Sequence, residues 1–346
     1  MSLLRIPGLI DAHVHLREPG ATHKEDFHTG SRAALAGGFT FILDMPNNPT
    51  PTITRERLEE KIALAKEKSL CDIGFHFGTN GHNSEEFAKV ADMPEVFGLK
   101  LYCNYTTGEM LIEDLALLEK VFASWKSEKP ILVHAEGAQL EITLGLSEKY
   151  KNRLHVCHTS QASEVELVRN AKMKKQKVTA GVCPHHLYLT KDAVAEMKGY
   201  AMMKPPLGTQ ADQDALWAGL KDGTIDIVET DHAPHTREEK EKEAPAYGVP
   251  GLETALGLMY KAVKDGKIKN EDVVKFLYTN PKAIFNIPDQ GDTYVELDPD
   301  LAYTAGENGY ETKCGWSPFT GMMLYGKPQN VIFRGQKVLD NGKIIT

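Results

Sequence analysis

Short apolar segments alternate with longer amphipathic segments through the first 290 residues of the chain. The apolar segments have the length and the Val, Ile and Phe content of strands that are covered on both faces. The intervening stretches, such as 54–69 and 161–175, space their apolar residues as one face of a helix does. The pattern predicts strands over 8–16, 40–47, 72–78, 97–103, 130–136, 153–159, 177–183 and 225–233.

This alternation predicts an α/β fold, a (β/α)₈ barrel of the TIM type. A doubly wound open sheet is the alternative, but no G-x-G-x-x-G motif follows a predicted strand. From about residue 289 the pattern changes to short alternating strands, and Asp340-Asn341-Gly342 is typical of a hairpin turn. We therefore expect a barrel over 5–288 and a small C-terminal β-appendage over 289–346, packed on the barrel.

Composition narrows the class of protein. The chain has 346 residues, of which 41% are hydrophobic and 25% charged, as in ordinary globular proteins. Its net charge of −8 does not favour nucleic acid as a partner, and no apolar run is long enough to predict a membrane helix. The N-terminus does not resemble a secretory signal, and the five cysteines include no C-x-x-C pair. We expect a cytoplasmic protein without disulfides.

Residues that can bind a metal stand at or near the ends of most predicted strands. In a (β/α)₈ barrel these ends meet at one mouth, where active sites are built. Each residue alone is typical of a helix cap or a structural hydrogen bond, but their convergence favours a metal site. Imidazole and carboxylate ligands without thiolates favour zinc, with manganese, iron and cobalt as alternatives. The residues are His13, His15, Lys100, His134, His158 and Asp231.

Six side chains exceed what one tetrahedral zinc ion accepts, so two ions are expected. Two ions at the spacing of binuclear sites need a bridging group. A protonated lysine cannot ligate a cation. A deprotonated Lys100, however, could react with carbon dioxide to form a carbamate that offers one oxygen to each metal.

The motif GLIDAHVHLREPG, residues 8–20, places two histidines and an arginine at alternate positions. Because side chains alternate along a strand, His13, His15 and Arg17 are expected on one face. By the same parity, His155 and Cys157 are expected to face the helices or to lie beside the site, unlike His158. The run REEKEKE, residues 237–243, is predicted to be a solvated charged loop.

Six motifs in order along residues 5 to about 290 resemble those of the cyclic amidohydrolases. Within that group the chain is most similar to the dihydroorotase branch that includes the dihydroorotase domain of the animal multifunctional pyrimidine polypeptide. PGLET at 250–254 and the C-terminal hairpin also match. The motifs are DAHVHLREPG, GLKLY, VHAE, HVCHTS, CPHHL and TDHAPHT.

The resemblance implies a role for each matching residue. It implies one zinc on His13, His15 and Asp231 and a second on His134 and His158, bridged by carboxylated Lys100 and a hydroxide. Asp231 would also transfer the proton. Substrate contacts are implied for Arg17, Asn47, His235, the loop Ala246-Tyr247-Gly248, and Thr106 in the mobile loop 103–109. Lys204 stands where the family commonly has Asn or Arg, which weakens that transfer. Some close relatives hold a further zinc through a Glu at the position of Gly181 and a Cys matching Cys157, and glycine cannot supply that ligand.

The resemblance implies reversible cyclisation of N-carbamoyl-L-aspartate to dihydroorotate in pyrimidine biosynthesis. Allantoinase and the hydantoinases, or dihydropyrimidinases, are the alternative enzymes, and Arg17 favours a carboxylated substrate over theirs. An inactive scaffold partner of aspartate transcarbamoylase is the alternative from another class. A homodimer and an association with that transcarbamoylase are both left open.

Overall fold

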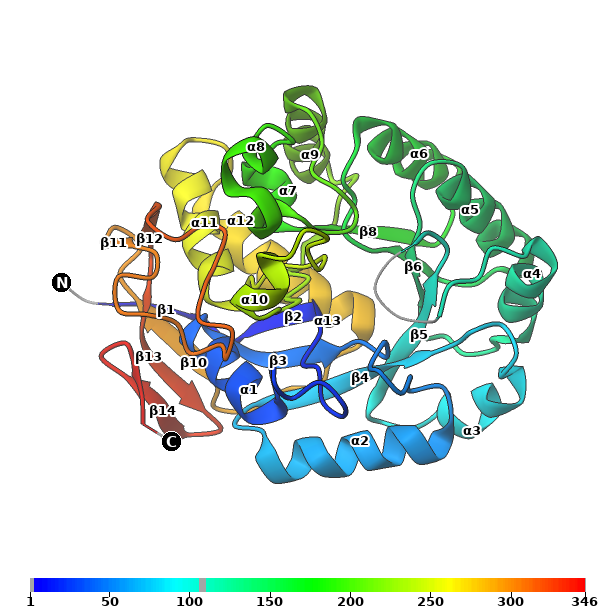
Figure 1. Cartoon of the computed structure of the whole chain (residues 1–346), viewed down its shortest axis with the longest axis horizontal. Coiled ribbons are helices and arrows are strands. Elements are labelled where there is room, and N and C mark those ends of the chain that lie inside the picture. The colour runs from blue at the N-terminus through cyan, green and yellow to red at the C-terminus, as the bar shows by residue number, and fades with distance from the viewer. Residues whose placement is uncertain (1–2, 106–109, 346) are drawn as a thin grey trace.

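The computed structural model describes residues 3–105 and 110–345. Within these residues, eight parallel strands pair in chain order to form a barrel (Figure 1). A bridge between Val14 and His232 links the first strand to the segment after the last one, which closes the barrel on one side. The strands are β2 (Leu9–Val14), β3 (Phe39–Asp44), β4 (Asp72–Gly78), β5 (Val96–Tyr102), β6 (Ile131–His134), β7 (Leu154–Val156), β8 (Val178–Val182) and β9 (Ile227–Val228).

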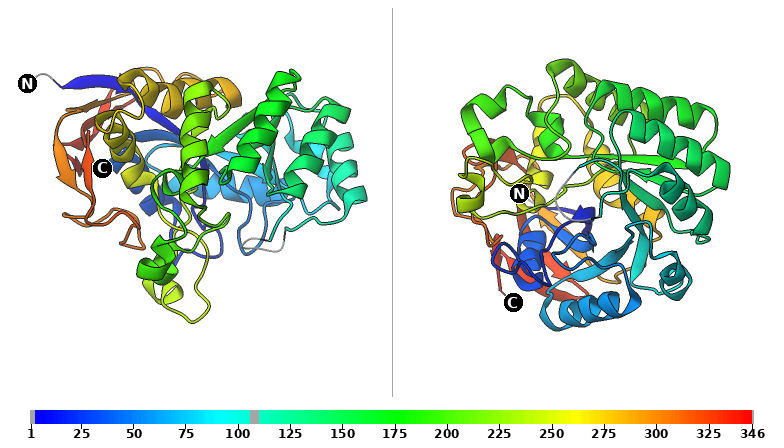
Figure 2. Two further views of the ribbon diagram at one scale, coloured as in Figure 1. Left: turned by 90° about the horizontal axis from the view of Figure 1, so that it is seen from above. Right: turned by 45° about the vertical axis from the view of Figure 1, so that its right-hand side comes forward.

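Helices connect the strands and lie around the barrel (Figures 1 and 2). Thr54 begins α2 as predicted, because its hydroxyl accepts a hydrogen bond from the Arg57 amide. The helices are α1 (Phe27–Ala36), α2 (Arg55–Lys68), α3 (Phe87–Val90), α4 (Leu115–Ser124), α5 (Ala138–Tyr150), α6 (Ala162–Met173), α7 (Pro184–Tyr188), α8 (Ala193–Met197), α9 (Gln210–Asp222), α10 (Arg237–Lys240), α11 (Leu252–Lys264), α12 (Asn270–Val274) and α13 (Asn280–Phe285). The predicted barrel with its surrounding helices is confirmed.

Two sets of apolar side chains build the core. Outward-facing strand residues such as Leu9, Ile42 and Leu99 pack against the helices in one large buried cluster. Inward-facing residues such as Phe41 and Leu132 fill the barrel together with Phe285 of α13. The barrel interior is therefore a packed core, and the polar residues lie at the ends of its strands.

The appendage is a five-stranded antiparallel sheet in the order β1-β10-β13-β14-β15. Its strands are β1 (Leu4–Pro7), β10 (Tyr294–Leu297), β13 (Pro328–Phe333), β14 (Gln336–Asp340) and β15 (Lys343–Ile344). Asn341 and Gly342 join β14 to β15 with φ values of 48° and 76°, as the predicted Asn-Gly turn requires. Both described ends of the chain lie on this side of the barrel (Figure 2).

Residues 5–7 belong to this sheet rather than to the barrel in which we placed them. Their alternation was too short to separate from β2, which follows after one residue. A smaller pair of strands, β11 (Ala302–Thr304) and β12 (Met323–Tyr325), follows β10 in the chain. Among the described residues, no helix is both long and apolar enough to span a bilayer.

Candidate active site at the barrel mouth

The six residues predicted to ligate metal converge at the carboxyl ends of the strands. The imidazole of His13 lies 5.2 Å from that of His15 and 5.1 Å from that of His158, between ring centroids. The ring of His134 is 4.7 Å from that of His158. Asp231 Oδ1 lies 3.0 Å from His15 Nε2 and 3.4 Å from His13 Nε2. All of these side chains are buried.

The donor atoms of this cluster fit a cation. Burial holds the pKa of His15 well below its usual range, so the ring is neutral. Its Nδ1 donates to Asn47 Oδ1 at 2.7 Å, which leaves the lone pair of Nε2 facing the carboxylate of Asp231. Two electron pairs at 3.0 Å repel each other unless a positive charge lies between them. His13, His15 and Asp231 accordingly form a candidate metal-binding group.

Two further rings of the cluster face each other. His134 Nδ1 lies 3.1 Å from His158 Nε2, and His134 Nε2 lies 3.6 Å from Glu136 Oε1. His158 Nδ1 is buried without a hydrogen bond among the described residues. Burial also lowers the pKa of His13 to about 4, so that ring too offers a lone pair near neutral pH. Neutral imidazoles are the form in which histidine binds metals.

Lys100 of β5 is fully buried beneath the histidines. Its Nζ lies 3.1 Å from Cys157 Sγ and 5.0 Å from the centre of the Tyr102 ring. In the described part of the chain no carboxylate lies within ion-pair distance of this nitrogen. A thiol and an aromatic ring, rather than a carboxylate, therefore surround the Lys100 nitrogen in this buried position.

Arg17 is turned toward the segment after β9 rather than continuing the face of β2. Its φ of 63° breaks the alternation of the strand. The Nε group donates to the Pro234 carbonyl at 3.1 Å, and an Nη donates to His235 Nε2 at 3.2 Å. Burial and the Arg17 charge lower the pKa of His235 to about 2, which keeps that ring neutral. Arg17 is thus the cationic group of this pair.

The loop at 246–248 lies beside His235. Gly248 has a φ of 131°, and a Cβ there would lie 2.6 Å from the Ala233 carbonyl oxygen. The position therefore requires glycine. Lys204 Nζ lies 5.1 Å from the centre of the Tyr247 ring, so these two predicted contacts lie together. Thr106, the remaining predicted substrate contact, lies outside the described residues.

Comparison with known proteins identifies the family of this chain. The model of the amidohydrolase family matches residues 4–338. The chain is 34% identical to a dihydroorotase of Lactobacillus acidophilus over 97% of its own length and 88% of that protein. The chain belongs to the amidohydrolase family. Its barrel carries a candidate metal-binding group at the mouth.

Some relatives of this amidohydrolase are much longer proteins. The chain is 42% identical to the multifunctional protein pyr1-3 of Dictyostelium discoideum, with 99% of this chain aligned. It spans only 15% of the length of that relative.

Solved structures show the same architecture. An L-hydantoinase (dihydropyrimidinase) from Arthrobacter aurescens superposes with a TM-score of 0.93 at 25% identity, covering 99% of this chain and 87% of that one. The inactive dihydroorotase-like domain of a CAD-like multifunctional protein from Chaetomium thermophilum superposes with a TM-score of 0.84 at 27% identity. That match covers 99% of this chain and 97% of the other.

Of the two placements predicted for His155 and Cys157, the one that faces the helices is wrong and the one beside the site is confirmed. Both side chains point into the barrel of the amidohydrolase, where Cys157 meets Lys100 and His155 Nε2 lies 3.3 Å from Glu229 Oε2. The strand ends at Val156, and His158 has a φ of 38°, so alternation does not extend from His155 to His158. Glu229 itself was missed, because a Glu before Thr-Asp-His has no marker in the sequence.

Lys240 also departs from its prediction. It lies within the charged run 237–243, yet it is only 1% exposed. Its Nζ donates to the carbonyls of Met202, Ala246 and Gly248 at 2.9, 2.7 and 2.9 Å. The buried Lys240 side chain therefore holds the loop at 246–248 in place through its carbonyl groups. Only the packing of three loops could reveal this, since its neighbours in sequence are exposed.

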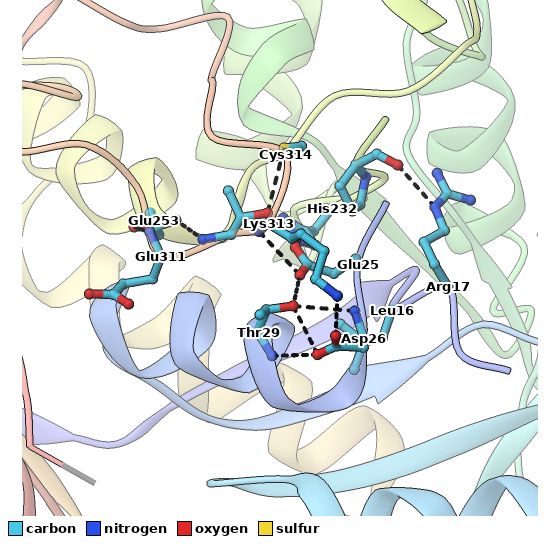
Figure 3. A network of polar contacts seen from close by, with 12 residues as sticks. Leu16, Arg17, Glu25, Asp26, Thr29, His232, Glu253, Glu311, Lys313 and Cys314 are labelled. Carbon is cyan, nitrogen blue, oxygen red and sulfur yellow. Dashed lines mark hydrogen bonds and ion pairs between the residues drawn. The ribbon is translucent and has the colours of Figure 1, made fainter. Parts of the chain in front are cut away.

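A polar network ties the segment between β11 and β12 to the mouth of the amidohydrolase barrel (Figure 3). The Thr312 and Thr29 hydroxyls both donate to the buried Glu25 carboxylate, and His232 Nε2 lies 3.4 Å from it. Glu253 accepts the backbone N–H groups of Glu311 and Thr312, at 2.9 and 3.0 Å. Further along the segment, the Trp316 indole donates to the His235 carbonyl at 2.8 Å. The segment between β11 and β12 thus supports the loops that carry the site.

Proposed function

We propose that this amidohydrolase is a dihydroorotase that interconverts dihydroorotate and N-carbamoyl-L-aspartate. The observation that carries the proposal is the Arg17–His235 pair beside the histidine cluster. A guanidinium forms a planar, charge-assisted contact with a carboxylate, and dihydroorotate carries one. The similarity to full-length dihydroorotases supports the same substrate.

We further propose a binuclear zinc centre. His13, His15 and Asp231 would hold one ion, and His134 and His158 the other, with carboxylated Lys100 as a bridge between them. Bound zinc would lower the pKa of the attacking water and polarise the ring carbonyl. The close approach of His134 Nδ1 to His158 Nε2 and the buried Lys100 support this set of ligands.

The protein groups would orient the substrate and move the proton. Arg17 would hold the substrate carboxylate, with Asn47, His235, Lys204, Tyr247, Gly248 and Thr106 as further substrate contacts. Asp231 would take the proton of the attacking water as the carbonyl carbon is attacked. It would return that proton to the ring nitrogen when the carbon–nitrogen bond breaks.

The alternative is a cyclic-amide hydrolase of the hydantoinase or allantoinase type. The close superposition on the Arthrobacter L-hydantoinase favours it at the level of the fold. Uncharged cyclic amides would leave the buried Arg17 guanidinium without an anion, which costs binding energy. An inactive scaffold, like the inactive dihydroorotase-like domain from Chaetomium, is less well supported, because all six metal-ligating positions are filled here.

Association with aspartate transcarbamoylase is a second proposal. Its support is the match to one segment of a multifunctional protein. Sedimentation of the purified chain, alone and mixed with a transcarbamoylase, tests it together with the homodimer that the sequence left open. A single monomeric species in both samples contradicts both proposals.

One experiment tests the proposed function directly. Metal analysis of the purified protein is combined with turnover of carbamoyl aspartate, dihydroorotate, hydantoin and allantoin. We expect about two zinc-like ions per chain and turnover of the first two compounds only. Full activity with one ion or fewer contradicts the binuclear centre, and preferential turnover of hydantoin or allantoin contradicts the substrate.

A further inference from the structure

Glu229 places one carboxylate among three strands of the barrel. It follows β9 directly, is fully buried, and precedes Asp231 by two residues. Its Oε1 accepts the backbone N–H of His158 at 2.6 Å and lies 3.8 Å from His13 Nδ1. Its Oε2 lies 3.3 Å from His155 Nε2. The carboxylate therefore faces the back of the cluster proposed to hold metal.

Gly181 of β8 makes room for this carboxylate. A Cβ at position 181 would lie 2.5 Å from the Glu229 carboxylate carbon and 2.5 Å from Oε1. The φ of Gly181 is not positive, so glycine is required there by space rather than by backbone conformation. The missing side chain at position 181 therefore provides the space that the Glu229 carboxylate occupies.

The orientation of the His13 ring depends on the groups that face its two nitrogens. Its Nε2 faces Asp231 at 3.4 Å, so its Nδ1 points away from the proposed metal. Among the described residues Nδ1 has no hydrogen-bond partner, and Glu229 is its ion-pair partner. When Nε2 gives its lone pair to a cation, Nδ1 carries the proton and seeks an acceptor. Glu229 Oε1, 3.8 Å away, is the carboxylate oxygen that Nδ1 faces.

The hydrogen bond between Glu229 and His158 constrains the backbone of His158. A φ of 38° is uncommon for a residue other than glycine and persists only where the surroundings hold it. The 2.6 Å hydrogen bond from its N–H to Glu229 ties this turn to β9. The same carboxylate thus constrains one residue of each proposed zinc site.

We propose that Glu229 is a positioning residue that orients His13 and His158 for metal binding. The inference rests on the proposed metal centre, and it adds a residue that no motif identified. Carboxylates behind metal-binding histidines fix the tautomer and the direction of the ring, and their loss typically weakens metal affinity 10- to 100-fold.

The test compares three variants at one pH. Glu229→Gln keeps the shape and removes the charge. Glu164→Gln is the matched control, because Glu164 is buried and accepts the Ser160 N–H of the same loop without an ion pair to His13. Glu229→Gly with Gly181→Asp moves the carboxylate to β8, since the Cβ of residue 181 points at the vacated position. Zinc affinity is measured by competition with a chelator, and the melting temperature is measured on the metal-free proteins.

We expect Glu229→Gln to bind zinc roughly 10- to 100-fold more weakly while its metal-free melting temperature stays near that of the control. The double variant should recover most of the affinity, and KM at saturating zinc should not change because Arg17 does not contact Glu229. Unchanged zinc affinity in Glu229→Gln overturns the proposal. Loss of one bound zinc ion, with normal affinity for the remaining zinc, also overturns the proposal. In that case Glu229 would be a metal ligand together with His155 and Cys157. A wild-type chain that binds zinc but turns over neither dihydroorotate nor carbamoyl aspartate contradicts the proposed function alone.

Discussion

Three residues of the candidate site hold backbone conformations that are rare outside glycine. Arg17, His158 and Asp231 have φ values of 63°, 38° and 46°. Each stands just beyond the end of its strand, where the chain must turn a side chain toward the mouth. Such conformations persist only where the surroundings hold them, and they cluster at functional sites. The backbone at these points is therefore part of how the site is built.

Arg17→Met tests the contact to the substrate carboxylate. The change removes a charge-assisted hydrogen-bonding group worth roughly 1.5–3 kcal/mol, or about 10- to 150-fold in kcat/KM for dihydroorotate. Metal content should stay at the wild-type level, because Arg17 contacts Pro234 and His235 rather than the histidine cluster. Steady-state kinetics measure kcat/KM, and metal analysis measures the metal content. Normal dihydroorotate kinetics would rule out the contact.

Lys100→Ala tests the proposed bridge. Without the lysine no carbamate can form, so we expect loss of activity and of bound metal. Small carboxylic acids such as acetate should restore part of the activity, since a carboxylate can supply two bridging oxygens. Rate measurements with and without acetate give the answer, and intact-protein mass reports on the modification. An active, metal-loaded wild-type protein with an unmodified Lys100 would contradict the proposal.

At the scale of elements, a local polar contact holds the loop that follows β7. Glu164, in the first turn of α6, accepts the Ser160 and Gln161 amides that follow β7. Burial raises the pKa of this carboxyl to about 7, although these hydrogen bonds oppose the shift. The folded chain therefore keeps a proton on Glu164 at pH values where an unfolded chain has released it.

This difference predicts how stability changes with pH. The free energy of unfolding should lose the Glu164 contribution as pH rises from the ordinary carboxyl pKa near 4.5 toward 7. Each unit between the two pKa values is worth about 1.4 kcal/mol. Glu164→Gln cannot titrate, so its stability relative to wild type should improve by a few kcal/mol between pH 4.5 and 7.5. Denaturant unfolding at the two pH values measures the change.

Glu166→Gln is the control for this prediction, because Glu166 lies on the same helix with an exposed side chain. Its stability relative to wild type should change little over the same interval. A pH response of Glu164→Gln no larger than that of Glu166→Gln would show that Glu164 does not hold its proton in the folded state.

At the scale of the whole molecule, the segment between β11 and β12 supports the mouth of the barrel from outside. Trp316 lies in the segment between β11 and β12, packs against Tyr200 with ring centroids 4.9 Å apart, and donates to the His235 carbonyl. Lys240 Nζ lies 5.6 Å from the Trp316 ring centre. Residues more than 80 positions apart in sequence thus hold one another in place.

Trp316→Phe tests this support. The ring is retained, but the hydrogen bond to His235 is lost, which costs about 1 kcal/mol. We expect KM for dihydroorotate to rise about fivefold with metal content unchanged. Trp217→Phe removes the same kind of bond, from the indole to the Leu187 carbonyl on the outside of the barrel, and should leave KM alone. Equal effects of the two variants would mean that Trp316 acts on stability only.

The sequence by itself determined the class of fold and the main residues of the candidate site. Apolar strands alternating with amphipathic helices specify a barrel, because each segment buries its apolar side chains in one way only. The strand ends then lie at one mouth of the barrel, so the pattern predicted that His13, Lys100 and His134 lie close together. Their roles stay predictions until metal and substrate are measured.

Only the tertiary structure decided what surrounds these residues. Side-chain parity holds within a strand and is lost where φ becomes positive, so the inward placement of Cys157 could not be read from its distance to His158. The burial of Lys240 and the position of Glu229 depend on the approach of segments distant in sequence. Charges and hydrogen bonds act through space between such segments, and a linear pattern carries no record of which of them will meet.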